Sequence, residues 1–309
     1  MHAAVVDSFD APPHYGEHPE PRTTRPGELV VDVLAAGLHP RVRSQAGGSH
    51  YTSTGELPFV PGIDGVVRDA DGRLRYAVLD DTTLGTMAER TIIETDRSIV
   101  LPDDVDPVKI AAAMNPAMSS WMALQRRIEF QPGQRILILG ATGNAGRMAV
   151  QVAKALGAGE VIAAGRNPEL LDELPALGAD RTCLLTELHR AADIDVVLDY
   201  LWGEPAAHAV PAIVRARSDR SSPLAWVQIG SIAGLDAAIP SAALRSARLS
   251  IVGSGIGSVP GREFIEELPA LVTAVTSGSF DVRARAVPLA DVEQTWLRPD
   301  RHARVVLVP

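Results

Sequence analysis

The sequence predicts an α/β protein, with a doubly wound parallel sheet in its central part and a β-rich domain before it. Two observations carry this prediction. From about residue 135 to residue 276, short apolar runs alternate with helix-like stretches, beginning with a run, a glycine-rich turn and a helix-like stretch. Such alternation is typical of strands and helices that wind around a parallel sheet. Residues 1–107 instead read as short alternating segments divided by turns, which favours β structure.

A glycine-rich turn, Gly140–Gly146, lies between the apolar run Arg135–Leu139 and the helix-like stretch Arg147–Leu156. In this context a glycine at 143 lets the backbone approach a pyrophosphate, and a glycine at 146 lets the helix pack closely on the strand. The helix N-terminus offers free N–H groups to the phosphates. A tight turn without a ligand is the alternative, but both flanks favour dinucleotide binding. The expected cofactor contacts here are Thr142, Gly143, Asn144, Ala145 and Gly146.

The segment Gly165–Asn167 follows the next apolar run, Glu160–Ala164, and bears on the choice of cofactor. An NAD-specific site carries an Asp or Glu about 20 residues after the glycines, where it binds the ribose 2′-hydroxyl. Here Gly165 leaves space, and the guanidinium of Arg166 suits a 2′-phosphate. A solvated surface arginine is the alternative. Because the acidic residue is missing, we expect NADPH, with Gly165, Arg166 and Asn167 among its contacts.

Composition predicts a cytoplasmic protein of two lobes. The 309 residues exceed a typical single domain, and a 46% hydrophobic content suffices for buried cores. No apolar run approaches the roughly 20 residues of a membrane span, and Met1–Asp7 begins like a strand rather than a signal peptide. The single cysteine, Cys183, excludes an intrachain disulfide and a multi-thiolate zinc site. A net charge of −9 disfavours nucleic acid and anionic membranes as partners.

Further elements follow from the apolar pattern. A helical segment from Val108 to Phe130 is expected, interrupted at Asn115–Pro116. Three more strands of the sheet and a final helix are expected at Asp195–Asp199, Ala225–Ile229, Leu249–Val252 and Glu263–Thr276. The last two apolar runs, Val282–Val287 and Ala303–Val308, are expected to return to the first domain.

Several segments in order along the whole chain resemble the zinc-independent quinone oxidoreductases of the medium-chain dehydrogenase/reductase superfamily. They are Ala36–Pro40, Val60–Gly65, Gly133–Gly157, Leu177–Asp180 and Pro288–Val292. The resemblance implies a GroES-like catalytic domain at residues 1–112, a Rossmann domain that binds NADPH at 113–257, and a return to the catalytic domain at 258–309. It also implies a homodimer, paired along the edge strand Arg248–Gly253.

Zinc alcohol dehydrogenases share this fold, so a metal site has to be weighed by position. Their catalytic cysteine would fall at His39 and their zinc-binding histidine at Ile63, which has no donor atom. The third ligand has no counterpart, because Asn115–Leu124 contains neither Cys nor His. The remaining histidines lack the spacing of a zinc site; they are His2, His14, His18, His50, His189, His208 and His302. We therefore expect no metal.

Without a Lewis acid, oxidation of an alcohol is disfavoured, whereas a quinone or an α,β-unsaturated carbonyl accepts hydride directly. The developing oxyanion then needs a hydrogen-bond donor. Tyr51 resembles the family's tyrosine beside the nicotinamide, although one extra residue separates it from Gly48; an anchoring loop tyrosine is the alternative. His39 stands where related reductases carry Asn or Asp, and would bond a substrate oxygen or the ribose; satisfying the turn before Pro40 is its alternative role.

Other site residues are expected where the parallel strands end, because ligands bind there. Backbone groups of Gly230, Ser231, Gly253 and Ser254 are expected to hold the nicotinamide ribose and carboxamide. Trp202, just beyond Asp199, is a candidate to roof the nicotinamide. The favoured function is an NADPH-dependent quinone or enone reductase. The alternative is a non-catalytic NADPH-binding sensor or structural relative, since the segment Val66–Met87 is shorter than in relatives.

Overall fold

The computed structural model describes residues 1–298, 300 and 303–309, so His302 lies outside the described residues. The chain forms two compact units, Met1–Asn115 with Leu268–Pro309, and Pro116–Glu267. The sequence predicts boundaries after residues 112 and 257. In the structure the chain crosses from one unit to the other inside two helices, α2 (Pro107–Met122) and α7 (Gly261–Thr276).

The unit Pro116–Glu267 is built on the doubly wound parallel sheet that the sequence predicts. Its strand order is β10-β9-β8-β11-β12-β13, with every neighbouring pair parallel. The order reverses between β8 and β11, and ligands of such sheets bind outside the carboxyl ends of the strands at that point. The strands are β8 (Arg135–Leu139), β9 (Glu160–Gly165), β10 (Arg181–Leu184), β11 (Val196–Asp199), β12 (Leu224–Gln228) and β13 (Leu249–Gly253).

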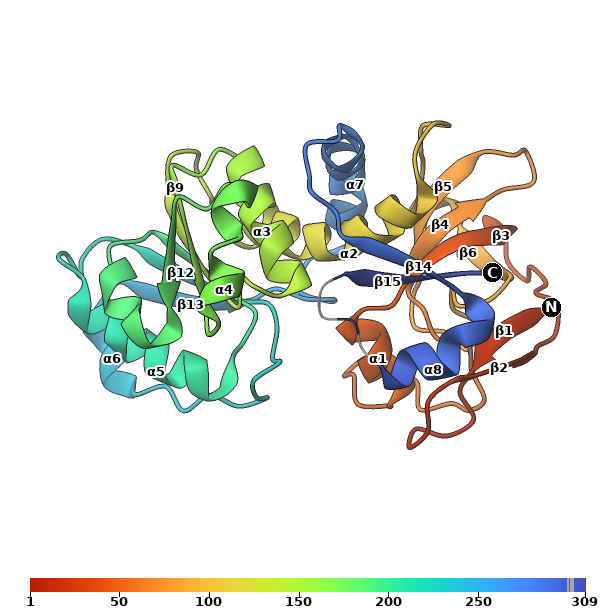
Figure 1. Ribbon diagram of the computed structural model, residues 1–309, viewed down its shortest axis with the longest axis horizontal. Helices are drawn as coiled ribbons and strands as arrows, with labels where there is room; N and C mark the ends of the chain where they lie inside the picture. Colours follow the sequence, from red (N-terminus) through yellow and green to blue (C-terminus); the bar gives the residue numbers. More distant parts are fainter. Residues whose placement is uncertain (299, 301–302) are drawn as a thin grey trace. The chain divides into compact units, whose positions relative to one another are not determined.

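Alternating apolar residues give this sheet two buried faces. In β8, Ile136 and Ile138 pack on the face covered by α3, while Leu137 and Leu139 pack on the face covered by α5. Figure 1 shows β9 and β12 between helices α3 and α6. The covering elements are α3 (Asn144–Ala155), α4 (Pro168–Leu171), α5 (Gly203–Ala216), α6 (Ser241–Arg245) and the 3₁₀ helices η3 (Leu174–Leu177) and η4 (Leu185–Ala191).

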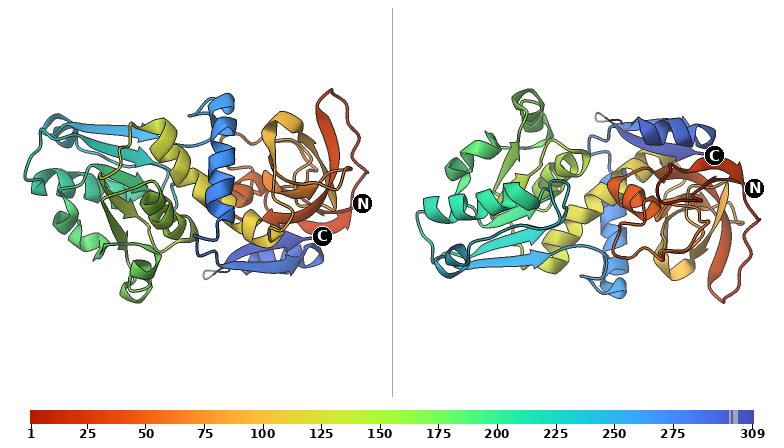
Figure 2. Two further views of the ribbon diagram at one scale, coloured as in Figure 1. Left: turned by 90° about the horizontal axis from the view of Figure 1, so that it is seen from above. Right: turned by 90° about the horizontal axis from the view of Figure 1, so that it is seen from below.

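The other unit is β-rich, and the last two strands return to it as predicted. Its main sheet has the order β14-β15-β3-β4-β5-β7, with β6 also paired to β3. In Figure 2 the blue C-terminal strands lie beside the red and orange N-terminal ones. The strands are β3 (Glu28–Gly37), β4 (Asp64–Arg68), β5 (Leu74–Val78), β6 (Arg90–Glu94), β7 (Ser98–Val100), β14 (Ala284–Pro288) and β15 (Arg304–Val308).

Smaller elements complete this unit around one apolar core, which includes Val33, Val67 and Leu307. β1 (His2–Val5) pairs with β2 (His14–Glu17), and α1 (Pro40–Ala46) follows β3. The remaining elements are α8 (Val292–Leu297) and the 3₁₀ helices η1 (Thr95–Arg97) and η5 (Leu289–Asp291).

Helix α2 corrects one expectation. The sequence predicts an interruption at Asn115–Pro116, but α2 runs through both residues and continues as a π-helical turn, η2 (Ala123–Arg127). Most of α2 is buried, and this tertiary packing outweighs the local cost of a proline inside the helix. None of the helices that the structure describes combines the length and the apolar character of a membrane-spanning segment.

Candidate functional site

The glycine turn packs tightly on the end of β8. A Cβ atom at Gly146 would lie 2.3 Å from the carbonyl oxygen of Gly140 and 2.6 Å from Cα of Ala141, so only glycine fits at the first turn of α3. A Cβ at Gly143 would approach the protein no closer than 3.6 Å. Packing within the protein therefore requires glycine at 146 but not at 143. The close approach of a phosphate to Gly143 stays a prediction.

The first turn of α3 is arranged to bind an anion. Gly143 is its N-cap, and no side chain caps the helix. The backbone N–H groups of the first turn have no carbonyl partner within the helix. Asn144 and Ala145 are half-buried, and Thr142 lies in the turn before them. A phosphate fits such a helix start through backbone N–H groups and the helix dipole.

Gly165 and Asn167 have structural roles that the sequence analysis does not foresee. A Cβ at Gly165 would lie 2.9 Å from Cγ2 of Thr142 and 3.2 Å from Cδ2 of Leu171, so the space beside this glycine is already filled. The expectation that Gly165 leaves room for a phosphate is therefore corrected: it lets the glycine turn pack against β9. The side-chain oxygen of Asn167 accepts hydrogen bonds from the N–H groups of Glu169 and Leu170, which makes it the N-cap of α4.

Arg166, between these two residues, has a different environment. It is exposed at the carboxyl end of β9, and its guanidinium forms no hydrogen bond or ion pair with any residue that the structure describes. An unpaired guanidinium at the end of the second strand is suited to a 2′-phosphate. Of the three predicted residues Gly165–Asn167, Arg166 is the one whose side chain is available to a ligand.

The other predicted cofactor contacts lie at the ends of β12 and β13. Ser231 and Gly253 are exposed, Gly230 is half-buried and Ser254 is buried. The carbonyl of Gly253 accepts a hydrogen bond from Nε of Arg127 at 2.7 Å. A Cβ at Gly230 would lie 2.7 Å from the carbonyl oxygen of Tyr200, so the segments after β11 and β12 are in direct contact.

In the β-rich unit, His39 forms a buried array with Asp64 and Tyr76. Nε2 of His39 lies 2.9 Å from Oδ1 of Asp64, and the Tyr76 hydroxyl donates to Oδ2 at 2.7 Å. The three side chains come from the N-cap of α1, the start of β4 and the middle of β5. Although His39 occupies the N-cap position of α1, its side chain makes no capping hydrogen bond and bonds to Asp64 instead.

The environment of His39 favours the neutral imidazole. Burial lowers the pKa of His39, and the cations Arg304 and Arg41 lower it further, against the opposing effect of Asp64. Nδ1 of His39 is buried and makes no hydrogen bond with the described residues. A buried polar atom without a partner is rare in proteins and is explained where a ligand completes it.

Tyr51 lies in the loop after α1. It is 71% exposed, and its ring contacts that of His50 in a tilted arrangement, with the centroids 4.2 Å apart and the planes at 31°. Nδ1 of His50 contacts Oγ1 of Thr52. The Thr52 hydroxyl and the Arg41 guanidinium both donate hydrogen bonds to the Asp81 carboxylate. Burial, assisted by Arg41, lowers the pKa of His50 to about 4.

The Tyr51 loop is tied to the segment that carries Ile63 and Asp64. Nε2 of Gln45 donates to Asp81 at 2.9 Å, while its Oε1 accepts from the N–H of Gly62 at 3.1 Å. The sequence analysis missed Asp64, Tyr76 and Asp81. Asp64 stands next to Ile63 in the stretch that is compared with zinc enzymes, so its carboxylate is visible there. Tyr76 and Asp81 join through strand pairing and loop packing, which no short motif reveals.

An apolar core side chain stands where zinc alcohol dehydrogenases carry their zinc-binding histidine. Ile63 is 4% exposed and belongs to the main apolar cluster of this unit. Among the described residues no group of three or more His, Cys, Asp or Glu side chains is arranged to hold a metal ion. Cys183 is partly buried, and burial raises the pKa of its thiol to about 11.

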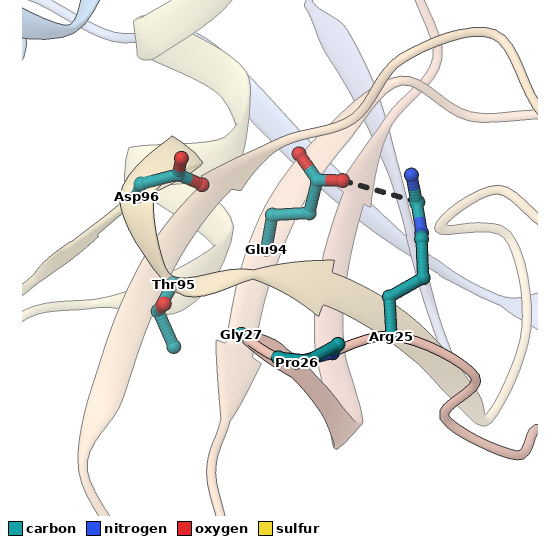
Figure 3. Close-up of a pocket in the computed structure, with 6 residues that line it drawn as sticks. All are labelled: Arg25, Pro26, Gly27, Glu94, Thr95 and Asp96. Carbon is teal, nitrogen blue, oxygen red and sulfur yellow. Dashed lines mark ion pairs between the residues drawn. The ribbon is translucent and has the colours of Figure 1, made fainter.

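A separate hollow in the β-rich unit does not involve the predicted site. The volume of the hollow is about 250 Å³. Figure 3 shows the residues that line it, which are Arg25, Pro26, Gly27, Glu94, Thr95 and Asp96. Arg25 pairs with Glu94 at 3.1 Å and with Glu28 at 2.8 Å, so its charge is already balanced. Ligand pockets are typically about 300–1,000 Å³ and mostly apolar. This polar hollow does not suit a quinone.

Comparison with known proteins relates the chain to oxidoreductases. No family model matches it. It is 30% identical, over an alignment of 362 positions that covers 100% of both chains, to a probable NADPH-dependent quinone reductase, tdiC, of Emericella nidulans. A chloroplastic NADPH-dependent alkenal/one oxidoreductase of Arabidopsis thaliana is 28% identical over 50% of this chain and 44% of that protein.

The solved structures agree with this relationship. The quinone oxidoreductase of Thermus thermophilus, described with its NADPH complex, superposes with a TM-score of 0.84 over 100% of both chains, at 26% identity. The likeness covers both the Rossmann unit and the GroES-like β-rich unit. The chain is therefore a member of the quinone oxidoreductase family of the medium-chain dehydrogenase/reductase superfamily.

Proposed function

We propose that this protein is an NADPH-dependent oxidoreductase that reduces a quinone or an α,β-unsaturated carbonyl without a metal ion. The observation that carries the cofactor assignment is the unpaired guanidinium of Arg166 at the end of β9, beside a glycine turn that opens α3. NADPH also appears in the names of the quinone reductase and the alkenal/one oxidoreductase that the chain resembles.

The predicted cofactor residues fit the parts of NADPH. Backbone N–H groups from Gly143 to Gly146 bind the pyrophosphate, and Arg166 binds the 2′-phosphate. Gly230, Ser231, Gly253 and Ser254 remain proposed contacts of the nicotinamide half, because they lie at the carboxyl ends of β12 and β13, the two strands beyond β11. Thr142, Gly165 and Asn167 act indirectly, by shaping the turn and the start of α4.

The chemistry of the β-rich unit supports reduction of an activated substrate rather than alcohol oxidation. His39 and Ile63 stand at positions where related dehydrogenases bind zinc. His39 bonds to Asp64 and Ile63 has no donor atom, so neither side chain is suited to bind a metal ion. Bound NADPH supplies the hydride. A quinone or enone needs no prior loss of a proton, whereas an alcohol needs a group that stabilises its alkoxide.

Tyr51 and His39 are the proposed site residues of this unit, with different roles. Tyr51 donates a hydrogen bond to the substrate oxygen as negative charge develops on it. His39 donates through Nε2 to Asp64, so its Nδ1 is left with a lone pair and accepts a hydrogen bond. It therefore binds a hydroxyl, such as a ribose hydroxyl, and not a carbonyl oxygen.

Two finer proposals concern the setting of the enzyme. We propose a two-fold dimer in which β13, the edge strand of the parallel sheet, pairs with its counterpart in a second copy. We also propose a cytoplasmic location, where NADPH is available and where a chain with a single cysteine needs no oxidising environment.

The test is NADPH consumption by the purified protein with a panel of quinones and short enones, followed at the absorbance of the reduced nicotinamide. We expect turnover with members of both classes, and much slower turnover with NADH. A parallel titration of NADPH binding separates the alternatives. Tight binding without turnover over the whole panel would favour a non-catalytic sensor and refute the proposal.

A further inference from the structure

Trp202 has a backbone conformation that residues other than glycine rarely adopt. Its φ is 51° and its ψ is −155°, and it has a positive φ unlike any other non-glycine residue that the structure describes. In this region the Cβ atom is crowded by the neighbouring carbonyl groups. Such conformations persist only where the surroundings impose them, and they are concentrated at ligand-binding sites.

The surroundings of Trp202 do impose it. Oδ1 of the buried Asp199 accepts hydrogen bonds from the N–H groups of Leu201, at 2.8 Å, and Trp202, at 3.0 Å. The carbonyl of Leu201 accepts from the N–H of Ala233 at 2.9 Å. Asp199 is itself fixed, because its Oδ2 accepts from Nε1 of Trp226 at 3.0 Å. The segment is therefore fixed by β11 on one side and by the loop after β12 on the other.

The position of this segment is where a parallel sheet binds its ligand. Trp202 follows β11, and the strand order reverses between β8 and β11. A Cβ at Gly140, in the glycine turn after β8, would lie 2.9 Å from Cδ2 of Leu201. The residue before Trp202 thus contacts the turn that receives the pyrophosphate under the proposed function.

The indole of Trp202 is not fully used by the fold. It is half-buried against the apolar cluster beneath it, and its Nε1 forms no hydrogen bond with a described residue. By contrast, the indole N–H groups of Trp121 and Trp226 donate to Glu267 and Asp199. The loop that contacts the Trp202 segment also carries Ile232, 76% exposed, and Leu235, 82% exposed. Apolar surface is therefore exposed on the loop that bonds to the Trp202 segment.

We propose that Trp202 is a ligand-stacking residue, whose indole packs on a planar, electron-poor ring at the carboxyl end of β11. The electron-rich indole suits either the oxidised nicotinamide of NADP⁺ or the ring of a quinone. The strained backbone is retained for this contact, because a glycine would adopt the same backbone without strain but would offer no ring. This inference rests on the proposed function and adds a residue that selects the ring of the ligand.

The first experiment separates strain from packing by comparing Trp202→Gly with Trp202→Ala. Both variants lose the indole, but alanine keeps a Cβ in the unfavourable region. We expect the glycine variant to melt roughly 1–4 °C above the alanine variant, since relief of strain outweighs the entropy cost of glycine. An equal or lower melting temperature for the glycine variant would overturn the claim of strain.

The second experiment measures binding of NADP⁺, of 2′-phospho-ADP-ribose, which lacks nicotinamide, and of a naphthoquinone. If nicotinamide is the stacked ring, Trp202→Ala should weaken NADP⁺ binding roughly 3- to 10-fold and leave 2′-phospho-ADP-ribose unaffected. If the quinone is stacked, only naphthoquinone binding weakens by this factor. Trp202→Phe, which keeps a ring, should bind within about 2-fold of wild type and keep the test valid if the alanine variant does not fold.

Fluorescence provides a direct readout of the contact. A ligand stacked on Trp202 should quench its emission, so the quenching should diminish in Trp202→Phe and persist in the control Trp121→Phe, whose indole bonds to Glu267. Affinities that do not change for any ligand, or quenching that survives in Trp202→Phe, would refute the inference. If the wild-type enzyme nevertheless oxidises NADPH, the proposed function stands without it. If the wild-type protein binds neither NADP⁺ nor naphthoquinone, the inference and the proposed function are both refuted.

Discussion

Nε2 of His39 lies 2.9 Å from Oδ1 of Asp64, and both side chains are about 1% exposed. The carboxylate is held between two donors, because the Tyr76 hydroxyl bonds to its other oxygen. An ionised carboxylate only accepts, so the imidazole proton resides on Nε2 and Nδ1 keeps its lone pair. Of the two partners expected for His39, a substrate oxygen or the ribose, this pairing favours a ribose hydroxyl, because Nδ1 can only accept a hydrogen bond.

The pH dependence of stability follows from the histidine environments. Burial lowers the pKa values of His39 and His50 in the folded state, that of His50 to about 4. Their unfolded pKa is near 6.5, so below that pH the unfolded chain binds more protons than the folded one. The melting temperature should therefore fall as the pH is lowered from 7 to 5.

Substitution tests this assignment. His39→Asn and His50→Asn each remove one titrating group, so each should flatten the decline of melting temperature between pH 7 and pH 5, whatever its effect at pH 7. His189→Asn, at an exposed position, is the control. Slopes in both variants as steep as in wild type would show that other groups cause the acid sensitivity.

Arg166 should determine the preference for NADPH. Arg166→Ala removes an exposed, unpaired guanidinium, and we expect NADPH binding to weaken by about 1.5–3 kcal/mol, roughly 10- to 150-fold, with little effect on NADH. Titration of both cofactors measures the effect. Arg181→Ala is a matched control, because Arg181 pairs with Glu160 at the opposite end of the strands. Equal losses for both cofactors would show that Arg166 does not contact the 2′-phosphate.

Much of the fold could be predicted because it depends on local patterns. The strand, glycine turn and helix around Gly146 need only residues close in sequence, and Gly146 is required by a contact within the same turn. The uninterrupted helix α2 was not predicted, because the cost of Pro116 is local and visible while the burial that offsets it is tertiary.

The site was predictable to a smaller extent. Arg166 could be proposed from the sequence, because the dinucleotide-binding motif places the residue that meets the ribose 2′ position about 20 residues after the glycines. The partner of His39 could not be predicted in this way, since Asp64 lies 25 residues further along the chain and contacts His39 only after β3 and β4 pair. The strain at Trp202 is likewise a property of the backbone, which the residue type does not encode.

Metal content tests the proposed mechanism. Ile63 cannot ligate and His39 Nε2 bonds to Asp64, so the purified protein should contain far less than one zinc ion per chain, and chelators should leave its activity unchanged. Elemental analysis gives the metal content. A tightly bound zinc ion that is required for turnover would contradict this expectation and reopen alcohol oxidation.

The assembly prediction depends on β13. This strand has no partner on its outer side within the described chain, and its Leu249, Ile251 and Val252 are only half-buried. Light scattering at micromolar concentration should show a dimer. Ser250→Lys places a charge on the exposed edge and should shift the dimer towards monomer, whereas Ser246→Lys, exposed beyond α6, should not. A wild-type monomer would refute edge pairing.

Tyr51 should act on the rate and not on cofactor affinity. If its phenol stabilises the developing oxyanion, Tyr51→Phe removes an interaction formed mainly in the transition state, so kcat should fall roughly 10- to 100-fold while NADPH binding is unchanged. The loss should be larger for enones than for quinones, because quinones are more activated and depend less on a donor. Steady-state kinetics with both substrate classes gives the comparison. His50→Asn removes the ring that contacts Tyr51 but leaves the phenol, so the kcat of this variant should fall less. A Phe variant with wild-type rates on both classes would leave Tyr51 as a packing residue of the loop.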